Sequence, residues 1–334
     1  MALNLEEIKK ILIIGSDDIG YNLLLTPAIK KIKDTYKNSE IEILIGQKSL
    51  DFVIENPWFS KYFVYKKTNY FCLLNILRKQ KYDLIIDFKN TLLPFCLKSK
   101  YKLTFFTKGF LSEKIYVHES EKIMSFIEPF LGKGELKLFF PVSNKYRDKI
   151  KEIFNSIEIK NSYLIVVLNP GSEYIYKRWD KKKFAELGKK LIKAYDAKII
   201  IVGLENDEKI TKEVKELIGD SNVFDFGGKT SLREVFAIFE LSDLVVTNES
   251  YYMYLACAAD TDIVAIYGPG NPYRYGPIGE KKFVVHSKID CFPCINSKKC
   301  KINFQCLKEI EVEDVFKYCA LILDEKCQPR LFEI

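Results

Sequence analysis

The residues best suited to hold a charged ligand lie in one stretch, residues 243–277, DLVVTNESYYMYLACAADTDIVAIYGPGNPYRYGP. The apolar run LVV is typical of a buried strand, and Ser250 is a good N-cap for the small-residue helix that follows. A strand that leads into a helix N-terminus leaves unpaired backbone N–H groups at the carboxyl edge of a parallel sheet, where nucleotide phosphates bind. We therefore expect Thr247, Ser250 and the N–H groups after Glu249 to hold phosphate or sugar hydroxyls.

A second candidate site consists of four thiols within sixteen residues, Cys291, Cys294, Cys300 and Cys306. Four thiolates can close around a structural zinc ion. Only one CxxC pair is present, so the spacing departs from that of a standard zinc ribbon. The alternative is that these are reduced thiols that only pack. The two histidines lie in different halves of the chain, which argues against a histidine-based metal or catalytic site.

Apolar runs alternate with amphipathic helical patterns along the chain. Runs such as KILIIG, IEILIG, YDLIIDF, YLIVVL, AKIIIVG and IVAIYG are typical of strands buried on both faces of a parallel sheet. This alternation predicts a doubly wound α/β protein. We place one Rossmann-like domain at residues 1–141 and a second at residues 142–325, followed by a tail at residues 326–334.

Composition narrows the function classes. The apolar content of 48% and charged content of 29% are those of a soluble globular protein, and no apolar run is long enough to span a membrane. The net charge of +7 suits an anionic ligand or a negatively charged membrane surface. Its lysines are spread over helix faces, so we expect no nucleic-acid partner. Nine cysteines without a signal peptide predict a reduced, cytoplasmic setting.

The stretch 243–277 resembles the donor-binding segment of glycosyltransferase family 9, the bacterial heptosyltransferases, whose usual form is T-N-D-S-G-x-x-H-x-A-A-A followed by V-A-x-[FY]-G-P. The matching residues are Thr247, Asn248, Ser250, Leu255, Ala256, Ala258, Val264, Ala265, Tyr267, Gly268 and Pro269. Two earlier blocks, NPGS with KRW and GGKTSLRE, resemble further family elements in the same order. The chain departs from the family at Glu249 for Asp, Tyr251 for Gly and Tyr254 for His.

This resemblance implies a GT-B architecture, with two Rossmann-like domains facing across a cleft. It implies inverting transfer of a sugar from a nucleotide-diphosphate donor, ADP-heptose in the family, to a lipopolysaccharide-core or other glycan acceptor. No metal or other cofactor is needed in that mechanism. The N-terminal domain would bind the acceptor, which is lipid-linked or a core oligosaccharide, and the C-terminal domain the donor. The protein could also contact the inner membrane surface peripherally.

The resemblance also implies donor-binding roles. Lys177 would contact a donor phosphate, beside Ser172 and Arg178, although a solvent-exposed loop lysine is the alternative. Glu205 or Glu208 follows a strand where an acidic residue can bind ribose hydroxyls, and helix capping explains these residues equally well.

Two tyrosines fall on donor-binding positions of the family pattern. Tyr251 would either fill the phosphate site or stack on a ligand, because the family's glycine lets the backbone approach closely. Tyr254 keeps a hydroxyl donor but loses a group that titrates near neutral pH. Both could instead be core aromatics.

In the first half, IGYNLLLTPAIKKIK resembles the family element S-x-G-D-x-[LV]-x-x-T-P-A-[LIV], with Gly20 and Asn22 on the acceptor side. The family's catalytic Asp falls on Tyr21, and a phenol with a pKa of about 10 is a poor base at neutral pH. Asp17 and Asp18 lie in the same loop, so either could replace the missing base. The alternative is that they cap the helix or are solvated.

We interpret the chain as an inverting glycosyltransferase that resembles the heptosyltransferases. The alternative is a family member that binds a nucleotide, glycan or protein partner without turnover. Tyr21, Tyr251 and Tyr254 support this alternative, because each replaces a residue that matters to the family's chemistry. Turnover of the donor distinguishes the two.

Overall fold

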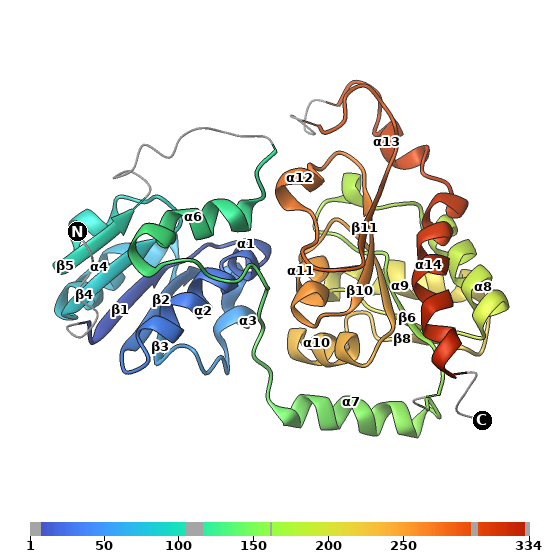
Figure 1. The fold of residues 1–334 in the computed structure, drawn as a ribbon, viewed down its shortest axis with the longest axis horizontal. Helices are drawn as coiled ribbons and strands as arrows, with labels where there is room; N and C mark the ends of the chain where they lie inside the picture. The colour runs from blue at the N-terminus through green and yellow to red at the C-terminus, as the bar shows by residue number, and fades with distance from the viewer. Residues whose placement is uncertain (1–7, 105–115, 161, 295–299, 331–334) are drawn as a thin grey trace. The chain divides into compact units, whose positions relative to one another are not determined.

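The structure is a computed structural model that describes residues 8–104, 116–160, 162–294 and 300–330. The chain divides into two compact units, Met1–Pro141 and Val142–Ile334 (Figure 1). The boundary predicted from the sequence lies at the same position. That unit 1 holds an acceptor and unit 2 a donor stays a prediction.

Unit 1 alternates short strands with helices. Its strands are β1 (Lys10–Ile14), β2 (Glu40–Gly46), β3 (Lys61–Tyr65), β4 (Tyr82–Asp87) and β5 (Ser99–Thr104). Its helices are α1 (Ile19–Leu24), α2 (Thr26–Thr35), α3 (Leu50–Val53), α4 (Tyr70–Lys79), α5 (Leu93–Cys96) and α6 (Glu119–Leu131). The strands lie in the order β3-β2-β1-β4-β5, and all neighbouring pairs are parallel.

The core of unit 1 follows from the apolar runs in these strands. Alternate residues of β1 point to opposite faces of the sheet, and its last four residues are all buried. On one face, Leu12 and Ile14 join a cluster with Leu73, Leu74 and Leu77 of α4. Helix α2 packs against α6. Of the helices that the structure describes, only α4 and α5, both short, contribute side chains to this apolar cluster.

Unit 2 contains the longer helices. Its strands are β6 (Ile165–Asn169), β7 (Lys198–Ile201), β8 (Val223–Asp225), β9 (Leu244–Asn248), β10 (Asp262–Tyr267) and β11 (Lys282–His286). Its helices are α7 (Asn144–Ser156), α8 (Lys181–Tyr195), α9 (Glu208–Ile218), α10 (Leu232–Glu240), α11 (Tyr251–Ala258), α12 (Pro272–Tyr275), α13 (Gln305–Lys308) and α14 (Val312–Arg330). The strands form a parallel sheet in the order β11-β10-β9-β6-β7-β8.

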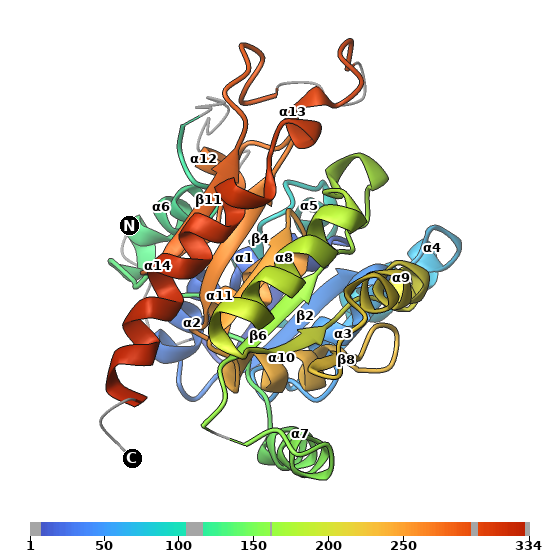
Figure 2. The same ribbon diagram turned by 90° about the vertical axis from the view of Figure 1, so that its right-hand side faces the viewer.

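Helices α8, α9 and α14 lie over one face of this sheet (Figure 2). Helix α8 begins after Asp180, its N-cap, which accepts a hydrogen bond from the backbone N–H of Lys182 at 2.6 Å. Helix α10 begins with a capping box between Ser231 and Glu234. These caps fix the helices against the sheet, whose carboxyl edge carries the turns described below.

Two details differ from the sequence analysis. Helix α14 continues to Arg330, so the tail expected from residue 326 begins inside a helix. Ser250 is the N-cap residue of α11, but its side chain makes no capping hydrogen bond.

Within the described ranges, no helix is both long and apolar enough to cross a membrane.

Candidate functional site

The candidate site of unit 2 lies where β6 and β9 end. Asn169, the last residue of β6, is 2% exposed. Its side-chain amide donates to Thr247 Oγ1 at 2.9 Å and to Ser250 Oγ at 3.0 Å. The Thr247 hydroxyl in turn donates to the carbonyl of Asn248 at 2.8 Å. The two hydroxyls that the sequence assigns to ligand binding are therefore brought together by a buried amide that the sequence analysis did not single out.

Asn248 holds the neighbouring turn in place. Its side-chain oxygen accepts from the backbone N–H of Trp179 at 3.0 Å, and its amide nitrogen donates to the carbonyl of Pro170 at 2.9 Å. Trp179 is buried, and its indole N–H donates to the carbonyl of Ile310 at 2.9 Å. Because β9 and the turn after β6 are bonded in this way, the segment that carries Lys177 is fixed at the sheet edge.

Lys177 and Glu249 form an ion pair at this edge. Lys177 Nζ lies 2.6 Å from Glu249 Oε1, and the two side chains are 22% and 12% exposed. The ammonium also lies 5.4 Å from the centre of the Tyr174 ring. Ser172 Oγ donates to the Glu249 carbonyl at 3.0 Å. The structure thus brings together three of the residues predicted to bind a donor.

The Glu249 carboxylate is tightly enclosed. A Cβ atom at Gly270 would lie 2.0 Å from Glu249 Oε2, so a side chain there would displace the carboxylate from its present position. Oε2 is buried and has no hydrogen-bond partner among the described residues. Lys177 is therefore the more accessible partner of the ion pair, and its bond to Glu249 fixes the position of the ammonium.

Arg178 is also paired with a carboxylate. Its guanidinium donates to the Ser172 carbonyl at 3.0 and 2.7 Å and to Asp207 Oδ1 at 2.8 Å. Burial raises the pKa of the Asp207 carboxyl, and the nearby charge of Arg178 opposes that rise. A Cβ atom at Gly171 would lie 2.2 Å from Asp207 Oδ2. Arg178 therefore braces the turn from within the fold.

Asp207 is the acidic residue of its segment that reaches the sheet edge, and the sequence analysis missed it. Asp207 is 2% exposed, whereas Glu205 and Glu208, which were predicted instead, are exposed. The sequence could have indicated this residue, since Asp207 lies between the two predicted residues, Glu205 and Glu208. Whether Glu205 or Glu208 contacts ribose stays a prediction.

Tyr254 and Tyr267, beside the site, hold the loop that follows β10. The hydroxyls of Tyr254 and Tyr267 donate to the carbonyl of Tyr275 at 2.8 and 2.5 Å. Burial raises the pKa of Tyr267 well above its usual value. The ring of Tyr251 contacts that of Tyr252 edge-on, with 5.0 Å between centroids. Tyr254 thus anchors the loop that follows β10, and a donor-binding role for Tyr251 or Tyr254 stays a prediction.

In unit 1, both predicted carboxylates have local partners. Asp18 is exposed and is the N-cap of α1, where it accepts from the backbone N–H of Tyr21 at 2.8 Å. Asp17 Oδ1 accepts from the backbone N–H of Lys48 at 3.0 Å and lies where a Cβ at Gly46 would stand. The capping alternative is thus what the structure shows for Asp18.

The neighbours of these carboxylates are held by the segments that follow β1 and β4. The Tyr21 hydroxyl donates to the carbonyl of Phe88 at 3.2 Å. Asn22 is fully buried, and its side chain accepts from the Ser16 N–H at 2.8 Å and donates to the Ser16 carbonyl at 2.9 Å. Gly20 is buried as well. Asn22 therefore shapes the loop, and acceptor contacts by Gly20 and Asn22 stay predictions.

The four clustered thiols do not form a recognisable metal centre. Within the ranges that the structure describes, no group of three or more His, Cys, Asp or Glu side chains is arranged to hold a metal ion. Burial raises the pKa of the Cys306 thiol to about 11, and Cys300, Cys291 and Cys294 add to that rise. The structure gives the zinc hypothesis no support. Metal analysis of the reduced protein would test it, because a filled site requires about one equivalent of zinc.

The amino-acid sequence is similar to proteins of one known family. A sequence model of glycosyltransferase family 9 (heptosyltransferase) matches residues 71–303. The chain is 26% identical to lipooligosaccharide heptosyltransferase 2 of Campylobacter jejuni, over 91% of this chain and 95% of that protein. The resemblance stated from the motifs is thereby confirmed.

Solved structures agree with the predicted fold class. A family 9 glycosyl transferase from Veillonella parvula is 22% identical, with a TM-score of 0.82 over 97% of this chain and 99% of that one. The ADP-heptose lipopolysaccharide heptosyltransferase II of E. coli is 19% identical, with a TM-score of 0.74 over 95% of this chain and 99% of that one. These likenesses confirm an α/β fold of the GT-B class.

Proposed function

The chain belongs to glycosyltransferase family 9, and from this premise we propose that it transfers a heptose from ADP-heptose to a glycan acceptor with inversion at the anomeric carbon. The acceptor is a lipopolysaccharide-core or other lipid-linked saccharide, met at the inner membrane surface. The observation that carries the proposal is the Lys177 ammonium, held by Glu249 at the sheet edge beside the start of α11.

The chemistry of the leaving group explains why a cation such as Lys177 is needed beside the donor diphosphate. Negative charge grows on the departing diphosphate as the bond to the sugar breaks, and preorganised cations and N–H groups stabilise it. The Lys177 ammonium has three N–H bonds and donates one to Glu249, which leaves two for phosphate oxygens. The first turn of α11 adds backbone N–H groups and the positive end of the helix dipole.

The acceptor hydroxyl must lose a proton as its oxygen attacks the anomeric carbon. Asp18 is the base we propose, because it is exposed and its carboxylate binds only one described backbone N–H. The proton passes to Asp18, the new glycosidic bond forms, and ADP leaves with the electrons of the broken bond. Asp17 is the second choice, because its carboxylate is held between Gly46 and the Lys48 N–H.

A binding function without turnover is the second candidate. It is favoured by the Tyr254 hydroxyl, which is engaged with the Tyr275 carbonyl, and by Tyr21, which stands at the position of the family's Asp.

One experiment separates the two functions. The purified chain is titrated calorimetrically with ADP, ADP-heptose, UDP and GDP, and release of ADP is then measured with a heptose-deficient lipopolysaccharide core. Transfer predicts selective binding of the adenine nucleotides and ADP release that depends on the acceptor. Nucleotide binding without release supports the non-catalytic function, and selective binding of UDP or GDP contradicts ADP-heptose as donor.

A further inference from the structure

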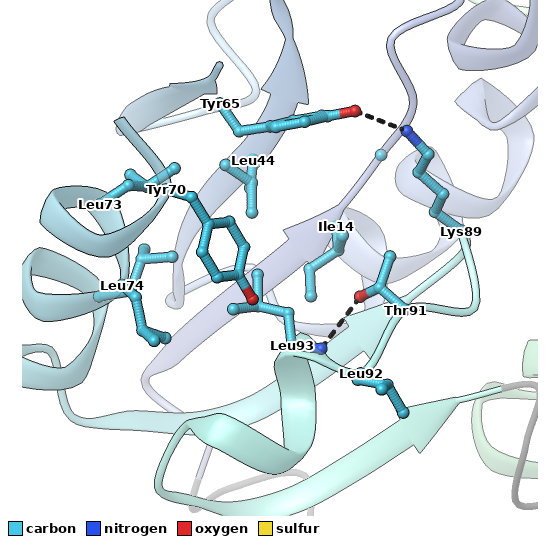
Figure 3. Close-up of a pocket in the computed structure, with 12 residues that line it drawn as sticks. Ile14, Leu44, Tyr65, Tyr70, Leu73, Leu74, Lys89, Thr91, Leu92 and Leu93 are labelled. Atoms are coloured by element: carbon cyan, nitrogen blue, oxygen red, sulfur yellow. Dashed lines mark hydrogen bonds between the residues drawn. The ribbon is translucent and has the colours of Figure 1, made fainter. Parts of the chain in front are cut away.

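Unit 1 contains a pocket of about 220 Å³ whose lining includes none of the residues assigned above to the donor, the acceptor or the base (Figure 3). Its walls come from the ends of β1, β2 and β3, from α4, and from the loop between β4 and α5. Most of the lining is aliphatic, from Ile14, Leu44, Leu73, Leu74, Leu77 and Leu93. Pockets that hold a whole drug-sized ligand span roughly 300–1,000 Å³, so this pocket fits one narrow arm of a molecule.

The pocket exists because the core under α4 is open at the carboxyl edge of the sheet. Leu73 and Leu74 are 7% and 8% exposed, yet the residues at the mouth are much more so, with Tyr70 at 41% and Leu92 at 71%. Exposed apolar side chains around a concave aliphatic surface are typical of a binding site.

Two polar groups of the inner wall are already hydrogen-bonded within the fold, which leaves the Tyr70 hydroxyl and the Lys89–Tyr65 end as the polar groups of the lining. The Thr91 hydroxyl donates to Asp87 Oδ2 at 2.8 Å and accepts from the Leu93 N–H at 3.3 Å. The Gly15 N–H donates to the Leu44 carbonyl at 2.9 Å. A sugar or nucleobase buried here would lose most of its hydrogen bonds to water, because the leucine-lined interior offers few partners in their place. The occupant is therefore an alkyl group.

One end of the pocket carries a cation. The Lys89 ammonium lies 3.2 Å from the Tyr65 hydroxyl and 5.0 Å from the centre of its ring (Figure 3). The nearest carboxylate in sequence, Asp87, accepts instead from the backbone N–H groups of Lys89 and Thr91 and from the Thr91 hydroxyl. In the part of the chain that the structure describes, the Lys89 ammonium has no ion pair. An acidic group on the ligand would complement it.

We infer that this pocket binds an alkyl chain that ends in an acidic group, with the chain between α4 and the sheet and the acid at Lys89. Leucine side chains supply the apolar walls, and Lys89 with the Tyr65 hydroxyl supplies the donors for the acid.

Calorimetric titration of the full chain with straight-chain carboxylates, from butyrate to decanoate, tests the inference. Each buried methylene should tighten binding by about fourfold until the pocket is full, after which longer chains gain nothing. Octyl glucoside, a neutral amphiphile, should bind more weakly than octanoate. Affinity that keeps rising with chain length, or equal binding of octyl glucoside, would mean surface adsorption and would overturn the site.

Three variants locate the binding. Leu74→Trp fills the pocket and should abolish decanoate binding, and Leu92→Trp, at an exposed position of the mouth, should weaken it without risk to folding. Lys89→Met should weaken decanoate by about fivefold, the upper range for an exposed ion pair, and leave octyl glucoside unchanged. Phe71→Ser is the matched control, because Phe71 is 80% exposed but does not line the pocket. Loss of binding in this control, or unchanged binding in folded Leu74→Trp and Leu92→Trp, contradicts the inference.

Discussion

Lys177 Nζ lies 2.6 Å from Glu249 Oε1, and these residues are 72 positions apart in the chain. The neighbouring cation, Arg178, is likewise paired with Asp207. The edge of the unit 2 sheet therefore presents two ion pairs rather than two unpaired cations. Attraction of a diphosphate therefore depends on the Lys177 N–H bonds that do not point at Glu249 and on the N-terminus of α11. Substitution of either member of the Lys177–Glu249 pair tests this.

Lys177→Met should weaken ADP binding by roughly ten- to a hundredfold, the range for loss of hydrogen bonds to a charged group. Methionine keeps the length of the side chain but cannot donate to a phosphate. Calorimetric titration with ADP measures the loss. Lys182→Met is the control, because Lys182 is an exposed lysine at the start of α8. ADP binding that equals that of the wild type would rule out this role for Lys177.

Glu249→Gln should tighten ADP binding by roughly fivefold, because it removes a negative charge beside the diphosphate while keeping the size of the side chain. Adenosine, which carries no phosphate, should bind as before. Comparison of the two ligands at low and high salt checks the cause, since the gain for ADP should shrink as salt screens the charges. Weaker ADP binding would instead mean that the negative charge of Glu249 is needed to aim Lys177.

The sequence could predict most strands because strands buried on both faces are continuous apolar runs. It made no prediction for β11 or α14. Strand β11 is an edge strand in which only Val285 is buried, so its apolar signal is weak. Helix α14 carries charged residues in both of its end segments and buries a strip that includes Val315, Cys319 and Ile322.

The candidate site was predictable only in part. Lys177 and Arg178 were identified because the local block NPGS with KRW resembles a family element. Their carboxylate partners could not be assigned in this way, because tertiary structure brings Glu249 to Lys177 and Asp207 to Arg178. Asn169 was missed for the same reason, since its partners lie within and just after a different strand, β9.

Glu234→Gln tests the contact between α7 and α10. Burial alone would raise the pKa of the Glu234 carboxyl, but hydrogen bonds from Lys149 and Ser231 outweigh it and lower the pKa. A lowered folded-state pKa contributes stability above the unfolded value of about 4.5, and this stability is lost as pH falls through the folded-state value. Glutamine keeps the capping box but has no charge.

The melting temperature of the Glu234→Gln variant should therefore lie below that of the wild type at pH 7, and the difference should shrink as pH falls below about 4.5. Thermal unfolding between pH 7 and 3 measures this. Glu216→Gln, at an exposed position of α9, should show no such trend. A difference that stays constant with pH would mean that the charge of Glu234 does not stabilise the fold.

Asp18→Asn separates capping from catalysis, because asparagine caps a helix about as well as aspartate but cannot accept a proton. If Asp18 is the base, turnover should fall by roughly a hundredfold or more while ADP affinity and melting temperature stay unchanged. Asp17→Asn should leave turnover within a few fold of the wild type. Tyr21→Asp restores the family's residue one turn into α1, where an acidic side chain also favours the helix dipole. That variant should restore turnover in the Asp18→Asn background. Wild-type turnover in Asp18→Asn, with loss of turnover in Asp17→Asn, would assign the base to Asp17 instead.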